Sequence, residues 1–126
     1  MSDITKQSLT ELVENIKDKK LSSTEVTKAF IDRSEKSKEL NAYITEDFTS
    51  ALDKAKKFDQ KPNLDLKLPG IPMAVKDLFC TKDVKTTAGS KILNNFVPTY
   101  ESTVTENIWK EGAILLGKLN CDEFAM

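Results

Sequence analysis

The sequence has no histidine and only two cysteines among its 126 residues. Without histidine, the chain cannot itself supply a Ser-His or Cys-His catalytic pair or an imidazole ligand for a metal ion. Cys80 and Cys121 are too few for a disulfide framework and too far apart for a zinc motif. We therefore expect two free, inert thiols and no metal site.

Long apolar runs and a strong net charge are also missing. No run approaches the ~20 apolar residues of a membrane-spanning helix, and the polar start over residues 2–7 lacks the apolar core of a signal peptide. A net charge of -1 gives no electrostatic case for direct binding to nucleic acid or an anionic membrane. With 39% hydrophobic and 31% charged residues, the composition predicts a globular cytoplasmic protein without membrane contact.

A phosphate-binding loop is missing as well. The stretch from Gly112 to Lys118 has the G-x-x-x-x-G-K spacing, but Leu119 stands where the motif needs a hydroxyl residue. Its middle also reads as a buried strand. We therefore expect no nucleotide site in this chain.

Helical patterns fill residues 8–58. The segments that begin at Ser8 and Ser22 both fit capping boxes, with glutamate three residues later. Apolar spacing then predicts one helix that ends near residues 17–20 and a second that runs to about Leu40. A short extended segment over residues 41–45 precedes a third helix.

The second half of the chain predicts a strand, a helix and a strand. The strands cover Met73–Phe79 and Ala113–Gly117, and Ser102 and Gly112 are placed to begin and end the helix between them. Such a crossover predicts parallel strands in an α/β sheet. Both strands read as central ones, and a sheet of two strands leaves its edges uncovered. We therefore expect residues 1–126 to be the front of a larger domain.

Lys76, in the first predicted strand, is the candidate catalytic residue. A free lysine has a pKa of about 10.4 and is no base at neutral pH, but burial in an apolar site lowers a lysine pKa by up to ~3–5 units. Strand alternation predicts that Asp77 points away from Lys76 and ties down the following turn. On residues alone, a paired or snorkelling structural role for Lys76 is the alternative.

Other polar residues have simpler structural interpretations. Lys118 follows a strand and a glycine, so we expect a partly exposed, structural lysine. Ser90 and Ser102 could be proposed as nucleophiles, but turn and helix-cap roles explain both.

Several blocks in order carry a family resemblance. They are Gly70-Ile71-Pro72-Met73-Ala74-Val75-Lys76-Asp77, Thr86-Thr87-Ala88-Gly89-Ser90, Gly112-Ala113-Ile114-Leu115-Leu116-Gly117-Lys118, Asn120 and Asp122-Glu123-Phe124-Ala125-Met126, with Leu21-Ser22-Ser23 and Leu40-Asn41-Ala42-Tyr43 upstream. This pattern resembles the opening of amidase-signature enzymes, and among them the glutamine-hydrolysing amidotransferase subunits. It departs from the family's usual residues at Leu78-Phe79, Leu119 and Cys121.

The resemblance implies a fold and an active site. The fold is the N-terminal part of the amidase-signature α/β domain, a mixed central sheet flanked by helices, with residues 1–60 helical and residues 61–126 giving the first strands. Family members use a nucleophilic serine, a second serine in a cis peptide, and a lysine as the terminal base. Lys76 matches that lysine, and Met126 ends a block near the substrate. Both family serines lie beyond Met126, so we expect residues 1–126 to be inactive alone.

The resemblance also implies substrates and partners. Glutamine would be hydrolysed, and its ammonia would pass to a heterotrimer's B and C subunits, where ATP and Mg²⁺ serve the amidation of Glu-tRNA(Gln). This chain would bind no cofactor. Two alternatives are a different small-amide amidase of the same family and a non-catalytic interaction module formed by the helices of residues 8–58.

Overall fold

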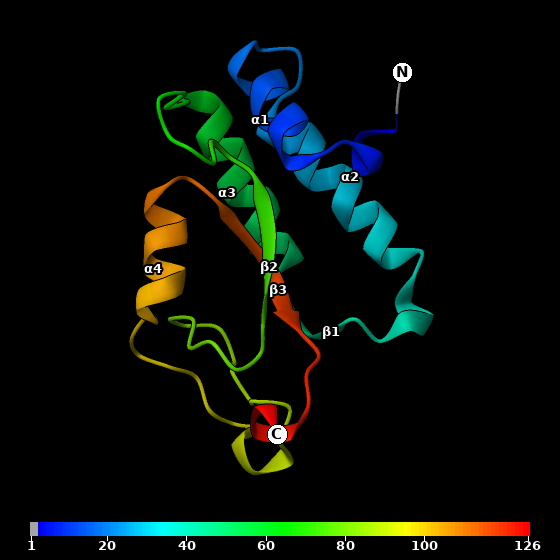
Figure 1. The fold of residues 1–126 in the computed structure, drawn as a ribbon, viewed down its shortest axis with the longest axis vertical. Helices are drawn as coiled ribbons and strands as arrows, with labels where there is room; N and C mark the ends of the chain where they lie inside the picture. The colour runs from blue at the N-terminus through cyan, green and yellow to red at the C-terminus, as the bar shows by residue number, and fades with distance from the viewer. Residues whose placement is uncertain (1–2) are drawn as a thin grey trace.

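The structure is a computed structural model that describes residues 3–126. None of the helices in these residues is long and apolar enough to cross a membrane. Helices and strands alternate along the second half of the chain (Figure 1). Their bounds are α1 Leu9–Lys17, α2 Ser23–Glu35, β1 Tyr43–Glu46, α3 Phe48–Gln60, β2 Pro72–Lys76, α4 Thr103–Lys110 and β3 Ile114–Leu119.

The predicted helix starts are confirmed. Ser8 and Ser22 each accept a hydrogen bond from the backbone N–H of the glutamate three residues later, and that glutamate accepts one in return. These reciprocal bonds satisfy backbone groups that a helix start otherwise leaves unpaired. Ser102 caps α4 in the simpler way, accepting from the backbone N–H of Thr105.

The second helix is shorter than the sequence predicts. It ends at Glu35 rather than near Leu40, and a separate 3₁₀ turn covers Lys38–Leu40. Asn41 then adopts a left-handed backbone conformation with φ of 49°. This conformation cannot continue a right-handed helix, so the chain turns there into β1.

The sheet contains three strands in the order β1-β3-β2. The pair β2 and β3 is parallel, which confirms the predicted crossover, and β1 joins β3 in antiparallel fashion. The extended segment near residues 41–45 is therefore a third strand. The predicted central position is confirmed for β3, whereas β2 lies at the edge of the sheet that these residues form.

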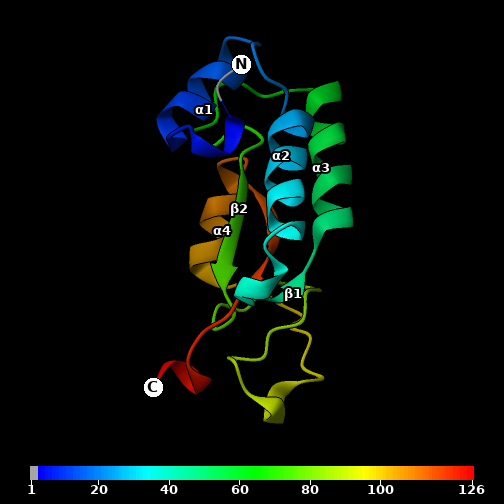
Figure 2. The ribbon, with the colours of Figure 1, turned by 90° about the vertical axis from the view of Figure 1, so that its right-hand side faces the viewer.

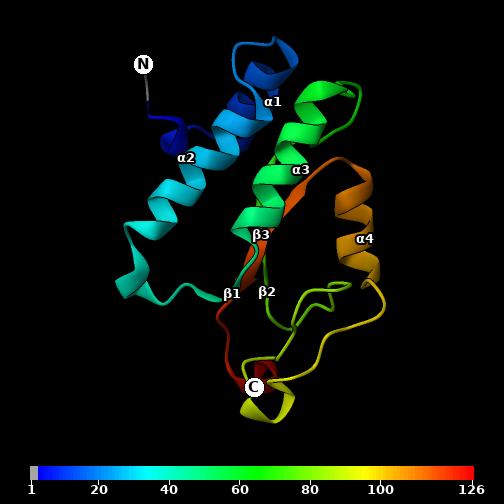
Figure 3. The same ribbon diagram turned by 180° about the vertical axis from the view of Figure 1, so that it is seen from behind.

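Helices lie on both sides of the sheet. In Figure 2 the strands stand between α4 on one side and α2 and α3 on the other, and Figure 3 shows α3 in front of β3. Apolar side chains of α3 and β3 form one buried cluster, which includes Ala51, Ala55, Ile114 and Leu116. A second cluster joins α1, α2 and the residue before β2. The resulting class is α/β with a mixed sheet, as predicted.

Candidate active site

Lys76 is the last residue of β2, and its side chain is exposed. The expected burial of this lysine is therefore wrong for this structure. In the register of the parallel pair, Val75 lies opposite Lys118 and Lys76 lies opposite Leu119. Successive side chains of a strand point to opposite faces, so Lys76 and Lys118 lie on different faces of the sheet.

An open surface depression surrounds Lys76, and its other lining residues are Asn120, Cys121 and Asp122. They come from the segment that follows β3. Two backbone hydrogen bonds hold this segment in place, from Asn120 N to Ala42 O at 2.8 Å and from Phe124 N to Ala88 O at 2.8 Å. The carboxyl ends of the two parallel strands thus meet at the candidate lysine.

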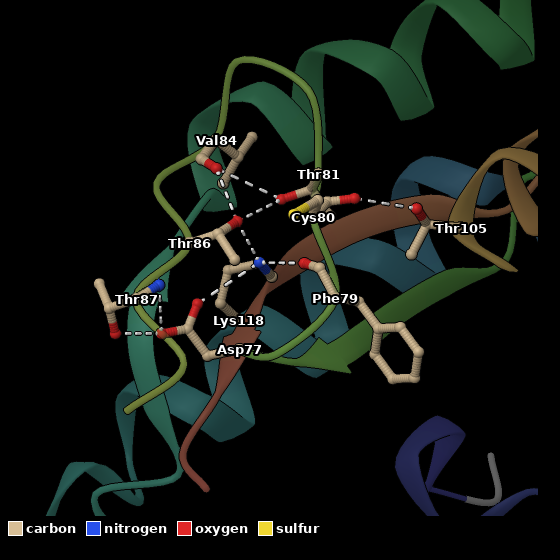
Figure 4. Close-up of polar contacts among 9 residues, drawn as sticks. All are labelled: Asp77, Phe79, Cys80, Thr81, Val84, Thr86, Thr87, Thr105 and Lys118. Atoms are coloured by element: carbon tan, nitrogen blue, oxygen red, sulfur yellow. Dashed lines mark hydrogen bonds and ion pairs between the residues drawn. The ribbon is translucent and has the colours of Figure 1, made fainter. Parts of the chain in front are cut away.

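Lys118, in the middle of the sheet, is the fully buried lysine. Its ammonium nitrogen Nζ lies 3.4 Å from Asp77 Oδ1. It also donates hydrogen bonds to the backbone oxygen of Phe79 at 2.8 Å and to Thr86 Oγ1 at 2.7 Å (Figure 4). The predicted partial exposure of Lys118 is wrong, because β3 is central and the loop after β2 closes over this side chain.

Asp77 is fully buried as well, and it points away from the exposed Lys76. Its Oδ2 accepts hydrogen bonds from the backbone N–H and the hydroxyl of Thr87, and its backbone oxygen accepts from Ala88 N at 2.9 Å. The predicted orientation of Asp77, and its role in holding the following turn, are confirmed. These contacts also explain why β2 ends at Lys76 rather than at Phe79.

The electrostatics of the site single out Lys118. Burial lowers the pKa of Lys118 below the ordinary lysine value of 10.5, although the charge and hydrogen bonding of Asp77 act to raise it. The perturbed lysine is thus held by three oxygen atoms and shielded from solvent. It cannot contact a substrate in this structure, whereas Lys76 can.

The remaining candidate residues have structural roles here. Ser90 Oγ donates to Glu123 Oε1 at 2.7 Å and accepts from Ile92 N at 3.3 Å, while Ser102 caps α4. Cys80 and Cys121 are free thiols, as predicted. Met126 is 92% exposed and is not among the residues that line the depression at Lys76. Its substrate-binding role stays a prediction.

Sequence reasoning missed the buried pair of Asp77 and Lys118, because the pair depends on the register between β2 and β3. In a parallel pair of strands, residues opposite one another share a face, and so does the residue two further along. Once Val75 is aligned with Lys118, Asp77 falls on the face of Lys118.

Residues 3–126 include no cluster of three or more His, Cys, Asp or Glu side chains that could hold a metal ion.

The family model for amidases matches residues 25–126. The chain therefore belongs to the amidase-signature family. It is 82% identical over its whole length to the A subunit of the glutamyl-tRNA(Gln) amidotransferase of Pelagibacter ubique (strain HTCC1062), and 49% identical to that of Hyphomonas neptunium (strain ATCC 15444). In both comparisons the chain spans 26% of the relative's length.

Solved structures share this fold. A bacterial aryl acylamidase of the amidase-signature family matches with a TM-score of 0.83 and 27% identity, over 94% of this chain and 26% of the acylamidase. The peptide amidase of Stenotrophomonas maltophilia matches with a TM-score of 0.83 and 28% identity, again over 94% of this chain and 26% of that enzyme. The fold of this chain is thus shared by an aryl acylamidase and a peptide amidase.

Proposed function

We propose that this chain is the part of a glutamine-hydrolysing amidotransferase subunit that carries the catalytic lysine, Lys76. The placement of Lys76 carries the proposal: it is exposed at the carboxyl end of a parallel strand, where α/β proteins bind their ligands. The 82% identity to the A subunit of an amidotransferase supports glutamine as the substrate. Residues 1–60 would form a mainly helical segment that also contributes β1, and residues 61–126 would add β2 and β3, within a single amidase domain.

In the intact protein, Lys76 would act as the terminal base of a Ser-cisSer-Lys triad. It would take up the proton that the nucleophilic serine loses, relayed through the second serine, and it must be uncharged to do so. The two serines would come from residues beyond Met126. Within residues 1–126, Ser90 and Ser102 are both committed to capping contacts.

The proposal extends to the partners. Ammonia released from glutamine would pass to the B and C subunits of a cytoplasmic heterotrimer, which would use ATP and Mg²⁺ to convert Glu-tRNA(Gln) into Gln-tRNA(Gln). The name of the 82% identical relative supports this assignment. No cofactor is assigned to this chain. Co-purification of the intact protein with both partners tests this part, and binding without any amide hydrolysis would favour a pure interaction module.

The catalytic assignment is tested by Lys76→Ala in the intact protein. Loss of a general base should reduce ammonia release from glutamine by roughly 100-fold or more, with an unchanged circular dichroism spectrum because the side chain is exposed. Lys91→Ala, at another exposed lysine, is the matched control and should keep full activity. Ammonia release by Lys76→Ala at the level of this control would contradict the assignment.

The isolated residues 1–126 should release no ammonia above the level of their own Lys76→Ala variant, because the serines of the triad are proposed to lie outside them. Hydrolysis of an aryl or peptide amide, but not of glutamine, by the intact protein would replace the proposed substrate with that of a small-amide amidase. The structural similarity to amidases of both kinds makes these the substrates to compare.

A further inference from the structure

A buried charge lies one residue away from the proposed base. Asp77 directly follows Lys76, and it is fully buried, so solvent and salt screen its charge weakly. A nearby carboxylate favours the charged form of an amine, whereas a general base must be uncharged at the working pH. Left alone, Asp77 would therefore oppose the chemistry proposed for Lys76.

We propose that Lys118 neutralises the Asp77 carboxylate and thereby allows Lys76 to act as a base, an inference that rests on the function proposed above. Lys118 and Asp77 are positioning residues in this scheme, since neither is exposed to a substrate. Among the ion pairs of residues 3–126, theirs alone has both side chains fully buried.

The geometry fits a fixed compensating charge. Lys118 Nζ lies 3.4 Å from Asp77 Oδ1, and two further oxygen acceptors, on Phe79 and Thr86, hold the ammonium in place. The other carboxylate oxygen of Asp77 is occupied by Thr87. The positive charge is thus anchored on the far side of the sheet from Lys76, where it offsets Asp77 without occupying the depression.

Other titratable groups surround the two lysines. Cys80 and Glu101 act on Lys118 in addition to Asp77, and both favour its charged form. Cys121 and Asp122 line the depression around Lys76. None of these four forms an ion pair with either lysine within the described residues. Among the ion pairs of the described residues, the one that Asp77 makes is with Lys118.

The pair also anchors the loop that follows β2, so a purely structural role has to be separated from the electrostatic one. Removal of Lys118 would release Phe79 and Thr86 in either case. Loosening of the loop lowers stability and rate at every pH. Loss of charge compensation instead moves the pH at which Lys76 becomes a free amine.

The experiment measures the pH dependence of Lys76 acylation by acetic anhydride in the intact protein, with mass spectrometry, beside the pH profile of ammonia release. In Lys118→Met, the pH of half-maximal Lys76 acylation should rise by roughly half a unit to one unit. The midpoint pH of the acidic limb of the activity profile should rise by the same amount. Acylation of the exposed Lys91, measured in the same samples, is the internal control and should not shift.

The double variant Asp77→Asn/Lys118→Met should return both midpoints to the parent values, because the uncompensated carboxylate is gone. Where Lys118→Met does not fold, Lys118→Gln removes the charge and keeps a hydrogen-bond donor. Parent-like acylation midpoints in Lys118→Met or Lys118→Gln overturn the inference. Failure of the proposed function gives a different result from failure of this inference. If Lys76 is not the catalytic base, Lys76→Ala keeps ammonia release, whatever the acylation midpoints show.

Discussion

Two lysines on neighbouring, hydrogen-bonded strands differ in their exposure to solvent. Lys76 ends the edge strand β2 and is exposed, whereas Lys118 lies in the central strand β3 and is fully buried. Lys118 has an ion-pair partner and two hydrogen-bond acceptors, while Lys76 borders an open depression. The same residue type is thus structural at one position and available to a ligand at the other.

This contrast shows that a family motif and a burial argument can point to different residues. Burial singles out Lys118 as the perturbed lysine, whereas the motif singles out Lys76. A lysine whose ammonium is held by a buried carboxylate is ordinarily a structural element. Access, rather than burial alone, therefore favours Lys76 as the residue that meets a substrate.

The largest expected difference between the two lysines is in stability. Lys118→Met should lower the free energy of unfolding by about 3–5 kcal/mol, because removal of one partner of a buried pair leaves the other charge uncompensated. Lys76→Met, at an exposed position, is the matched control and should stay within about 0.5 kcal/mol of the parent. Urea unfolding measures both, and equal losses would remove the distinction between the two positions.

A smaller loss of stability is expected when Thr86 Oγ1, which accepts a hydrogen bond from Lys118, is removed. Thr86→Val removes a hydrogen bond to a charged, buried group and should cost about 1.5–3 kcal/mol. Thr49→Val, at an exposed threonine of α3, is the control and should be close to neutral. If the two variants unfold at the same urea concentration, the hydrogen bond between Lys118 and Thr86 does not stabilise the fold.

The smallest effect is a pH dependence that Lys118 alone should produce. Its pKa is lowered in the folded state, so between that pKa and the ordinary 10.5 the unfolded chain binds more protons than the folded one. Stability contributed through Lys118 should therefore rise as the pH rises through this window, and be lost again as the pH falls. Subtraction of the Lys118→Met unfolding curve from the parent curve at each pH cancels other groups. A difference that falls with rising pH would contradict the lowered pKa of Lys118.

Local signals predicted much of the fold. The capping boxes at Ser8 and Ser22 and the cap at Ser102 act through residues three apart, so the sequence alone contains the whole interaction. The strand-helix-strand spacing likewise predicted the parallel pair of β2 and β3. The end of α2 was misplaced, because no glycine or proline follows Glu35 before Asn41 to mark the stop.

Contacts between distant segments were not predictable in the same way. The pairing of β1 with β3 joins residues more than 70 positions apart, and no local pattern marks it. The burial of Lys118 depends on the register with β2 and on the loop of Thr86 and Thr87 above it. Sequence reasoning therefore predicted the right orientation for Asp77, which strand alternation sets, but the wrong exposure for both lysines.

By itself, the sequence determined the helix boundaries set by caps, the α/β class and the family to which the motif of Lys76 belongs. Those properties depend on short-range bonds and on the order of residues along one strand. Only the tertiary structure decided which lysine is buried and which is exposed. The reason is physical: solvation of an ammonium depends on the strands and loops packed around it, and these come from other parts of the chain.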